Sequence, residues 1–197
     1  MEKNEILDII ISLVKGVNNE NHIEAGNQKL WGCEYLLNQT IRQYDIPTNH
    51  YFVSEEAKKL WDSITSDNIT DFYYQKKLTL DRVDGSIKLR CYTGNSKKYT
   101  EWTPSKGDKL TYRDVFHDEH IVPVKVIIEE LLKLEELNYE TVTKVLDNIR
   151  VCKMLKSEDK KITNKYKRPL DYKKAIAENY TPNGIVCLDI ITGEKII

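Results

Sequence analysis

The sequence lacks any long hydrophobic run. No apolar stretch approaches the roughly 20 residues that a helix needs to span a bilayer, and 31% of the 197 residues are charged. The first residues, MEKNEILDIIISLVKG, place acids before a short apolar stretch and contain no small-residue cleavage site. This pattern predicts an amphipathic helix and not a signal peptide. We therefore expect a soluble, cytoplasmic protein with no membrane partner.

Closely spaced cysteines are also missing. The four cysteines, Cys33, Cys91, Cys152 and Cys187, stand singly, without a Cys-x-x-Cys pair. Zinc knuckles and disulfide frameworks depend on such pairs or on dense spacing, so reduced, half-buried cysteines are expected. The chain has no internal repeat and no low-complexity tract either, which argues against a repeat architecture and against a low-complexity chain.

A net charge is almost absent, at −1 for the whole chain, but the charges are segregated. Between Arg150 and Lys174, ten Lys and Arg stand against three acids. A local basic run of this kind can attract a polyanionic partner even when the total charge is near zero. A solvated helical face is the alternative interpretation of the same run.

Apolar periodicity predicts that the first third of the chain is helical. Residues 3–16 carry apolar side chains at helical spacing and end at Gly16. The stretches EAGNQKLWGCEYLLNQTIRQY and SEEAKKLWDSI predict two further helices, with Ser54 as the N-cap of the second. Two alternating runs, 76–83 and 86–92, then flank an Asp-Gly turn signal and predict a β-hairpin.

The second half predicts a mixture of helices and strands. After FHDEHIVP, the apolar stripe of VKVIIEELLKLEEL indicates a helix with Pro123 in its first position. Further helices are expected at NYETVTKVLDN, SEDKKITNKY and PLDYKKAIAENY, and strands at IRVCKML and GIVCLDII. The predicted class is α+β: a helical region 1–75 for recognition or dimerisation, and an α+β region 76–197, joined in one compact unit.

The stretch FHDEHIVP carries residues suited to phosphodiester hydrolysis. That reaction needs a group that deprotonates water and a divalent cation that stabilises charge on the phosphate. Glu119 and His120 form an adjacent carboxylate and imidazole, and at a strand end both can line one pocket. Asn148 can orient the imidazole, and Glu158 or Asp159, at a helix start, can complete an oxygen-rich site for Mg²⁺ or Mn²⁺.

The strings DEHIVPV and DNIRVCKMLKSEDKK resemble the HNH (ββα-metal) nucleases. The likeness lies in an acid-His pair followed by an apolar-apolar-Pro run, an Asn before a strand, and a ligand on the next helix. It implies Glu119 as a ligand of one divalent ion, His120 as the general base and Asn148 as the middle Asn, with Glu158 or Asp159 as the last ligand. The implied activity is that of a DNA endonuclease. The size of the chain suits a sequence-specific, restriction-type enzyme, but homing, phage and toxin nucleases of this family are not separated from it by the sequence.

Double-stranded DNA is the partner that this interpretation predicts. Phosphate contacts from the basic run would make binding fall steeply with salt, through counterion release. A palindromic target would favour a homodimer, formed through apolar faces of the helical first third. The predicted nucleic-acid contacts are the basic residues around the motif: Arg113, Lys153, Lys156, Lys160, Lys161, Lys165 and Arg168.

Two other interpretations stay open at this point. In the first, the protein is a non-catalytic nucleic-acid or protein-binding module, HDEH is a structural bend, and the acids near Ser157 only stabilise a helix N-terminus. In the second, His117, His120 and a distant cysteine such as Cys152 hold a structural zinc ion, whose removal would unfold the chain. Metal content and the effect of His120→Ala separate these from the nuclease hypothesis.

Overall fold

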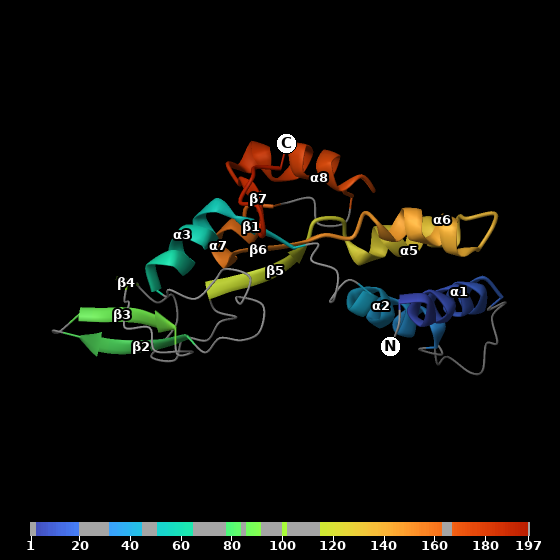
Figure 1. Ribbon diagram of the computed structural model, residues 1–197, viewed down its shortest axis with the longest axis horizontal. Helices are drawn as coiled ribbons and strands as arrows, with labels where there is room; N and C mark the ends of the chain where they lie inside the picture. The colour runs from blue at the N-terminus through green and yellow to red at the C-terminus, as the bar shows by residue number, and fades with distance from the viewer. Residues whose placement is uncertain are drawn as a thin grey trace. The chain divides into compact units, whose positions relative to one another are not determined.

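The structure is a computed structural model, and it describes residues 3–19, 32–44, 51–64, 78–83, 86–91, 100–101, 115–162 and 167–196. These residues form a mixture of helices and two β-sheets (Figure 1), so the predicted α+β class is confirmed. The helices are α1 Lys3–Asn19, α2 Cys33–Tyr44, α3 Glu55–Ile64, α5 Val124–Leu132, α6 Tyr139–Leu146, α7 Lys156–Asp159 and α8 Tyr172–Asn179. The strands are β1 Tyr51–Ser54, β2 Leu78–Val83, β3 Ser86–Cys91, β4 Thr100–Glu101, β5 Phe116–His120, β6 Val151–Leu155 and β7 Cys187–Asp189.

The chain divides into two compact units that interleave along the sequence. The helical unit comprises Met1–His50, His120–Arg150 and Asn164–Glu178, and the sheet unit comprises Tyr51–Glu119, Val151–Thr163 and Asn179–Ile197. The sequence-based division at residue 75 is therefore not the division made by the contacts. β1 and α3 come from the first third of the chain, yet they belong to the sheet unit together with β6 and β7.

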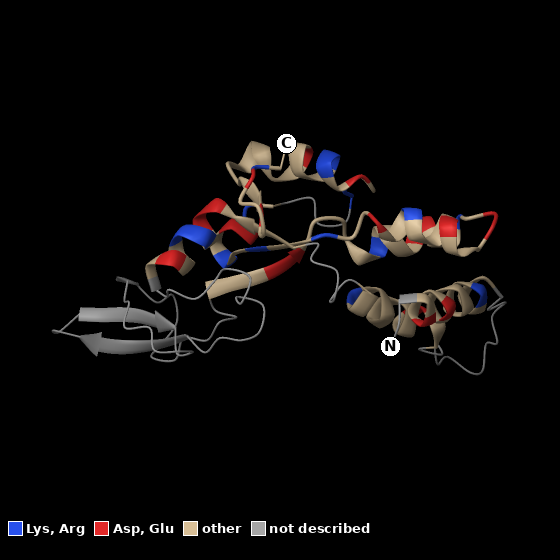
Figure 2. Cartoon of the chain, viewed as in Figure 1, with Lys and Arg blue, Asp and Glu red and all other residues tan. Residues whose placement is uncertain are grey.

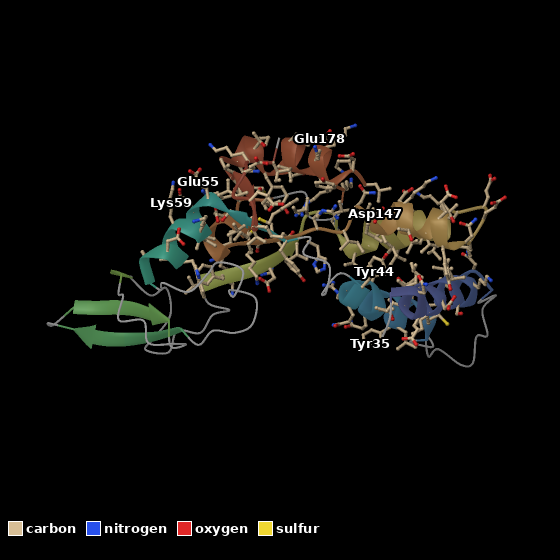
Figure 3. The ribbon with its side chains drawn as sticks, in the orientation of Figure 1. Tyr35, Tyr44, Glu55, Lys59, Asp147 and Glu178 are labelled. Atoms are coloured by element: carbon tan, nitrogen blue, oxygen red, sulfur yellow. The ribbon has the colours of Figure 1, made fainter. Side chains whose placement is uncertain are left out.

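In the helical unit, α1 and α2 pack closely against each other. A Cβ atom at Gly16 would lie 2.6 Å from the Sγ atom of Cys33, so only glycine fits this contact. α1 continues to Asn19, and the predicted helix end at Gly16 is wrong because that glycine serves close packing and not termination. The exposed side chain of Tyr35 on α2 is labelled in Figure 3.

The two helices that follow β5 begin with recognisable signals. The sequence predicted Pro123 in the first position of the helix, whereas in the structure Pro123 immediately precedes α5, which begins at Val124. α5 buries most of its apolar side chains. Asn138 caps α6: its side chain accepts the Thr141 N–H at 3.0 Å, and the Asn138 N–H donates to the Thr141 hydroxyl at 3.2 Å. This reciprocal capping box fixes the start of α6.

The sheet unit is built on a four-stranded mixed sheet in the order β5-β6-β1-β7. β1 runs parallel to β6, with Phe52 opposite Cys152, and antiparallel to β7, with Ser54 opposite Cys187. Where β5 ends and β6 begins, the Ile121 N–H donates to the Arg150 carbonyl at 2.9 Å. A bond between the end of one strand and the start of the next is the pattern of an antiparallel pair.

One face of this sheet packs under α3. The hydroxyl of Ser54 accepts the N–H of Ala57 at 3.2 Å, which confirms the predicted N-cap of α3. The buried cluster on this face combines residues of α3 with alternate residues of the strands: Tyr51, Val53, Ala57, Trp61, Val115, Phe116, Val151, Leu188 and Ile190. α7 follows β6 directly and lies against the opposite face of β5, where its residue Asp159 approaches His117.

A second sheet contains β2, β3 and β4 in that order. β2 and β3 are antiparallel, with Leu80 opposite Leu89, so the predicted hairpin is confirmed in its strands. Among the described helices, none combines the length and the apolar character that crossing a bilayer requires.

Candidate metal centre

Strand β5 sends its side chains alternately to the two faces of the sheet. Phe116 belongs to the buried cluster under α3. His117 and Glu119 therefore lie on the other face, and a direct contact between them, two residues apart, agrees with this placement. Asp118 lies on the same face as Phe116. The four charged or titratable residues of HDEH are thus divided between two environments.

His117, Glu119 and Asp159 form the group that can hold a metal ion among the described residues. One ligand atom from each lies within 4.8 Å of the other two. The Nε2 atom of His117 is 3.1 Å from Oε2 of Glu119 and 3.9 Å from Oδ1 of Asp159. The side chains of Glu119 and Asp159 are only 13% and 12% exposed, whereas that of His117 is 39% exposed. The group is therefore reached by solvent from the imidazole side.

These distances and donors fit a divalent cation. Two neighbouring ligand atoms, each about 2.1 Å from an ion, are about 3.0 Å apart in octahedral geometry and about 3.4 Å in tetrahedral geometry. The measured separations of 3.1 and 3.9 Å are close to that range. Two carboxylates and one imidazole suit Mn²⁺ and other first-row transition metals, and the oxygen pair also suits Mg²⁺.

On the opposite face of β5, a carboxylate is paired with a lysine side chain. The ammonium group of Lys153 on β6 lies 2.8 Å from Oδ1 of Asp118. The Lys153 side chain is 1% exposed, and that of Asp118 is 47% exposed. Burial lowers the pKa of the Lys153 ammonium group, and the negative charge of Asp118 opposes this shift. The pair therefore joins β5 to β6 through a buried charge whose partner reaches the solvent.

The short helix α7 carries Asp159, the third member of the group. It directly follows β6, and its residue Glu158 is 4% exposed. Oε2 of Glu158 accepts the Ser54 hydroxyl at 2.5 Å and the Leu155 N–H at 2.8 Å. Of the two acids that the sequence offers as the last ligand, Asp159 is the one beside His117, and Glu158 is bound to protein groups.

The other two predicted catalytic residues lie elsewhere. His120 follows Glu119 directly on β5, so strand alternation turns it to the opposite face, and its backbone carbonyl accepts the Arg168 guanidinium at 2.9 Å. Asn148 lies just after α6 in the helical unit and donates to the Lys144 carbonyl at 3.2 Å. The structure brings His117, and not His120, to Glu119 and Asp159.

The predicted nucleic-acid contacts fall into three groups. Lys156, Lys160 and Lys161 are exposed on and after α7, beside Asp159. Lys153 and Arg168 are buried, at 1% and 3% exposure, and contact protein groups. Arg113 and Lys165 lie outside the described residues. Figure 2 shows basic and acidic segments alternating along the helices.

Cys152 has surroundings unlike those of a zinc ligand. Its Sγ atom lies 3.9 Å from Sγ of Cys187, and both side chains are buried. The contact with Cys187, reinforced by burial, raises the pKa of the Cys152 thiol well above its usual range. The group that could hold a metal ion among the described residues includes neither Cys152 nor His120.

His117 is not among the catalytic residues and metal ligands predicted for the nuclease site, because the resemblance concerns the pair Glu119-His120. The sequence named it as a ligand in the alternative zinc site. A signal for it was present: in a strand, residues two apart share a face, and His117 and Glu119 have that spacing. Recognising FHDEH as a strand would have been enough to choose it.

The elements around the candidate site come from separate parts of the sequence. β5 and β6 are neighbours, and α7 follows β6 at once, while α5 and α6 are inserted between the two strands. Comparison of the chain with protein-family models, with curated proteins and with solved structures gave no match.

Proposed function

We propose that the protein is a divalent-metal-dependent endonuclease that hydrolyses phosphodiester bonds in DNA. The observation that carries this proposal is the convergence of His117, Glu119 and Asp159, with ligand atoms within 4.8 Å of one another. Two nearly buried carboxylates so close together repel each other, and a divalent cation between them removes that repulsion. The local order of β5, β6 and α7, and the resemblance of their sequences to HNH nucleases, favour nuclease chemistry for such a site.

In this proposal the three side chains have distinct tasks. Glu119 and Asp159 hold the cation from β5 and from α7, and His117 completes the ligand set from the more exposed side. When bound, the cation supplies a hydroxide nucleophile from water and stabilises negative charge on the phosphate. The exposed imidazole edge of His117 is the side from which a phosphodiester can approach.

The exposed lysines around α7 support a polyanionic substrate. Lys156, Lys160 and Lys161 surround Asp159 in sequence and carry their charges into solvent. A DNA backbone that enters beside α7 would meet these ammonium groups, and binding would weaken with salt as counterions are released. Double-stranded DNA, a homodimer and restriction-type sequence specificity belong to the same proposal.

Plasmid cleavage tests the proposal. Wild-type protein is incubated with supercoiled DNA in Mn²⁺, in Mg²⁺ and in EDTA, beside the variants Glu119→Gln, Asp159→Asn and His117→Ala. Glu56→Gln, an exposed carboxylate on α3 in the same unit, is the matched control. We expect metal-dependent cutting by wild type and control, and at least a hundredfold loss in the two carboxylate variants, because each removes a charged metal ligand. Circular dichroism verifies that all variants are folded.

Two results would overturn the proposal. One is the absence of cleavage by the wild type on double-stranded DNA, single-stranded DNA and RNA in either metal. The other is cutting that persists in both carboxylate variants. If DNA is bound but never cut, the binding-module interpretation takes its place. Discrete fragments from a linear substrate would establish sequence specificity.

A further inference from the structure

Glu158 occupies an unusual position for a charged side chain. It is 4% exposed, and it immediately precedes Asp159 on α7. One of its oxygens, Oε2, accepts two hydrogen bonds, from the Ser54 hydroxyl at 2.5 Å and from the Leu155 N–H at 2.8 Å. The first bond joins residues 104 positions apart in the sequence. The second caps the start of α7.

Ser54 connects this carboxylate to the centre of the sheet. It is the last residue of β1 and is fully buried. The same hydroxyl that donates to Glu158 accepts the Ala57 N–H at the start of α3. One hydroxyl therefore ties α7 to β1 and to α3 at a single point. We call this hydrogen-bonded connection, Ser54 to Glu158 to the Leu155 N–H, the Ser54–Glu158 link.

Helix α7 needs such a tie because it has only four residues, Lys156–Asp159. A helix of one turn has no stability of its own, so its position is set by what its side chains contact. Asp159 must meet His117 and Glu119, which are carried by β5. Because α7 and β5 are separate elements, the place of Asp159 depends on how α7 is held against the sheet.

We infer that Ser54 and Glu158 are positioning residues of the metal site. The Ser54–Glu158 link fixes α7 so that Asp159 reaches the cation, and Glu158 itself is not a ligand. This inference rests on the metal site of the proposed function. It assigns different roles to two adjacent acids: Asp159 binds the ion, and Glu158 anchors the helix that presents Asp159. Hydrogen-bond partners of metal ligands commonly change metal affinity about ten- to a hundredfold when they are removed. Ser54 and Glu158 act less directly, through the position of α7, so we expect the lower end of that range.

Mn²⁺ binding to the full chain tests this inference. Affinity is measured by electron paramagnetic resonance of free and bound Mn²⁺, for the wild type, Ser54→Ala, Glu158→Ala, Glu158→Gln and the Ser54→Ala/Glu158→Ala double variant. We expect Ser54→Ala and Glu158→Ala each to weaken binding about tenfold. The double variant should be no weaker than Glu158→Ala alone, because both substitutions break one link.

Glu158→Gln separates anchoring from ligation. Its amide oxygen accepts the same two hydrogen bonds, so the inference predicts affinity within about threefold of the wild type. A ligand role for Glu158 predicts instead a loss as large as that of Asp159→Asn. That loss would overturn the inference.

Asp189→Ala is the control for a general loss of stability. Oδ1 of Asp189 accepts the N–H groups of Ile191 and Thr192, both at 2.8 Å, in a turn of the same unit. β7, which carries Asp189, lies at the opposite edge of the sheet from β5. This variant should lower the melting temperature and leave Mn²⁺ affinity unchanged. A tenfold loss of affinity in Asp189→Ala would show that mere destabilisation weakens the site, and would overturn the inference.

The remaining outcomes separate the two proposals. If the wild type binds Mn²⁺ and Ser54→Ala binds it equally well, the positioning role is wrong and the metal site stands. If losses in the double variant add, the two residues do not act through one link, and the inference is again overturned. If the wild type binds no divalent ion, the proposed function and the inference both fall.

Discussion

The two faces of β5 place carboxylate side chains in different electrostatic surroundings. On the face under α3, Asp118 meets the ammonium group of Lys153 at 2.8 Å, so each charge has its counter-charge within the protein. On the other face, Glu119 and Asp159 come together beside His117. The first face pairs a carboxylate with an ammonium group. The second brings two carboxylates together, and under the proposed function a divalent cation binds there.

This difference separates a structural ion pair from the metal site that we propose. The pair Asp118–Lys153, in which only the ammonium group is buried, is sensitive to the removal of its carboxylate, because the buried charge then loses this partner. Where two carboxylates lie together, as at Glu119 and Asp159, removing one relieves their mutual repulsion, which offsets the loss of the 3.1 Å contact between Glu119 and His117. Asp118 and Glu119 are adjacent on one strand, but replacing each carboxylate by its amide should have different effects on the free energy of unfolding. It should fall for Asp118→Asn, and it should rise or stay close to the wild-type value for Glu119→Gln.

The largest effect is expected for Asp118→Asn. The substitution leaves the Lys153 ammonium buried without its carboxylate, and we expect a loss of about 3 kcal/mol in the free energy of unfolding. Urea denaturation followed by tryptophan fluorescence measures it, because Trp61 lies in the core of the same unit. A loss under about 1 kcal/mol would show that Lys153 is compensated by other groups.

Addition of Mn²⁺ should have an effect nearly as large on the wild type. At a concentration one hundred times the dissociation constant, a ligand that binds only the folded state stabilises it by about 2.7 kcal/mol. Glu119→Gln should show no such gain at the same concentration, because one of the three ligand atoms is replaced. Thermal unfolding of both proteins in Mn²⁺ and in EDTA gives the comparison. Equal shifts in both proteins would place the ion elsewhere.

Lys153→Met is expected to cost about 1 kcal/mol, less than Asp118→Asn. The methionine fills a similar volume, and the remaining Asp118 carboxylate is 47% exposed, so water can solvate it. The Asp118→Asn/Lys153→Met double variant should be more stable than Asp118→Asn alone. Chemical denaturation of the three variants tests this order, and strictly additive losses would contradict a direct pair.

The smallest effect on stability is expected for Glu119→Gln in EDTA. With no divalent ion, loss of this charge relieves its repulsion with Asp159, and the free energy of unfolding should rise or stay within about 0.5 kcal/mol of the wild type. Thermal denaturation in EDTA measures it. A loss comparable to that of Asp118→Asn would mean that the two faces of β5 are electrostatically alike.

The sequence was sufficient for elements whose signals are local. The apolar stripe of α5, the Ser54 cap of α3 and the alternation of β2 and β3 each depend on residues close together in the chain, and the structure contains all three elements. β1 was missed. It has only four residues, and nothing around Tyr51–Ser54 shows that its partners arrive a hundred positions later.

The candidate site was predicted only in part for the same reason. Glu119 and Asp159, two of the residues that the sequence named as ligands, lie together in the structure beside His117. Choosing His117 over His120 required the knowledge that β5 extends through all of FHDEH, and choosing Asp159 over Glu158 required the long-range contact with Ser54. Both choices depend on tertiary contacts, which no local pattern contains.

The pairing of β1 with β6 has a consequence for how the chain folds during synthesis. Tyr51 lies opposite Val151, and a ribosome adds about 5 to 20 residues each second, so β1 waits roughly 5 to 20 s for its parallel neighbour. During that interval the apolar strand exposes unpaired backbone groups, which can template pairing with another chain. High contact order of this kind slows folding. The nascent protein is thus most prone to aggregate after β1 has emerged and before β6, its parallel neighbour, does.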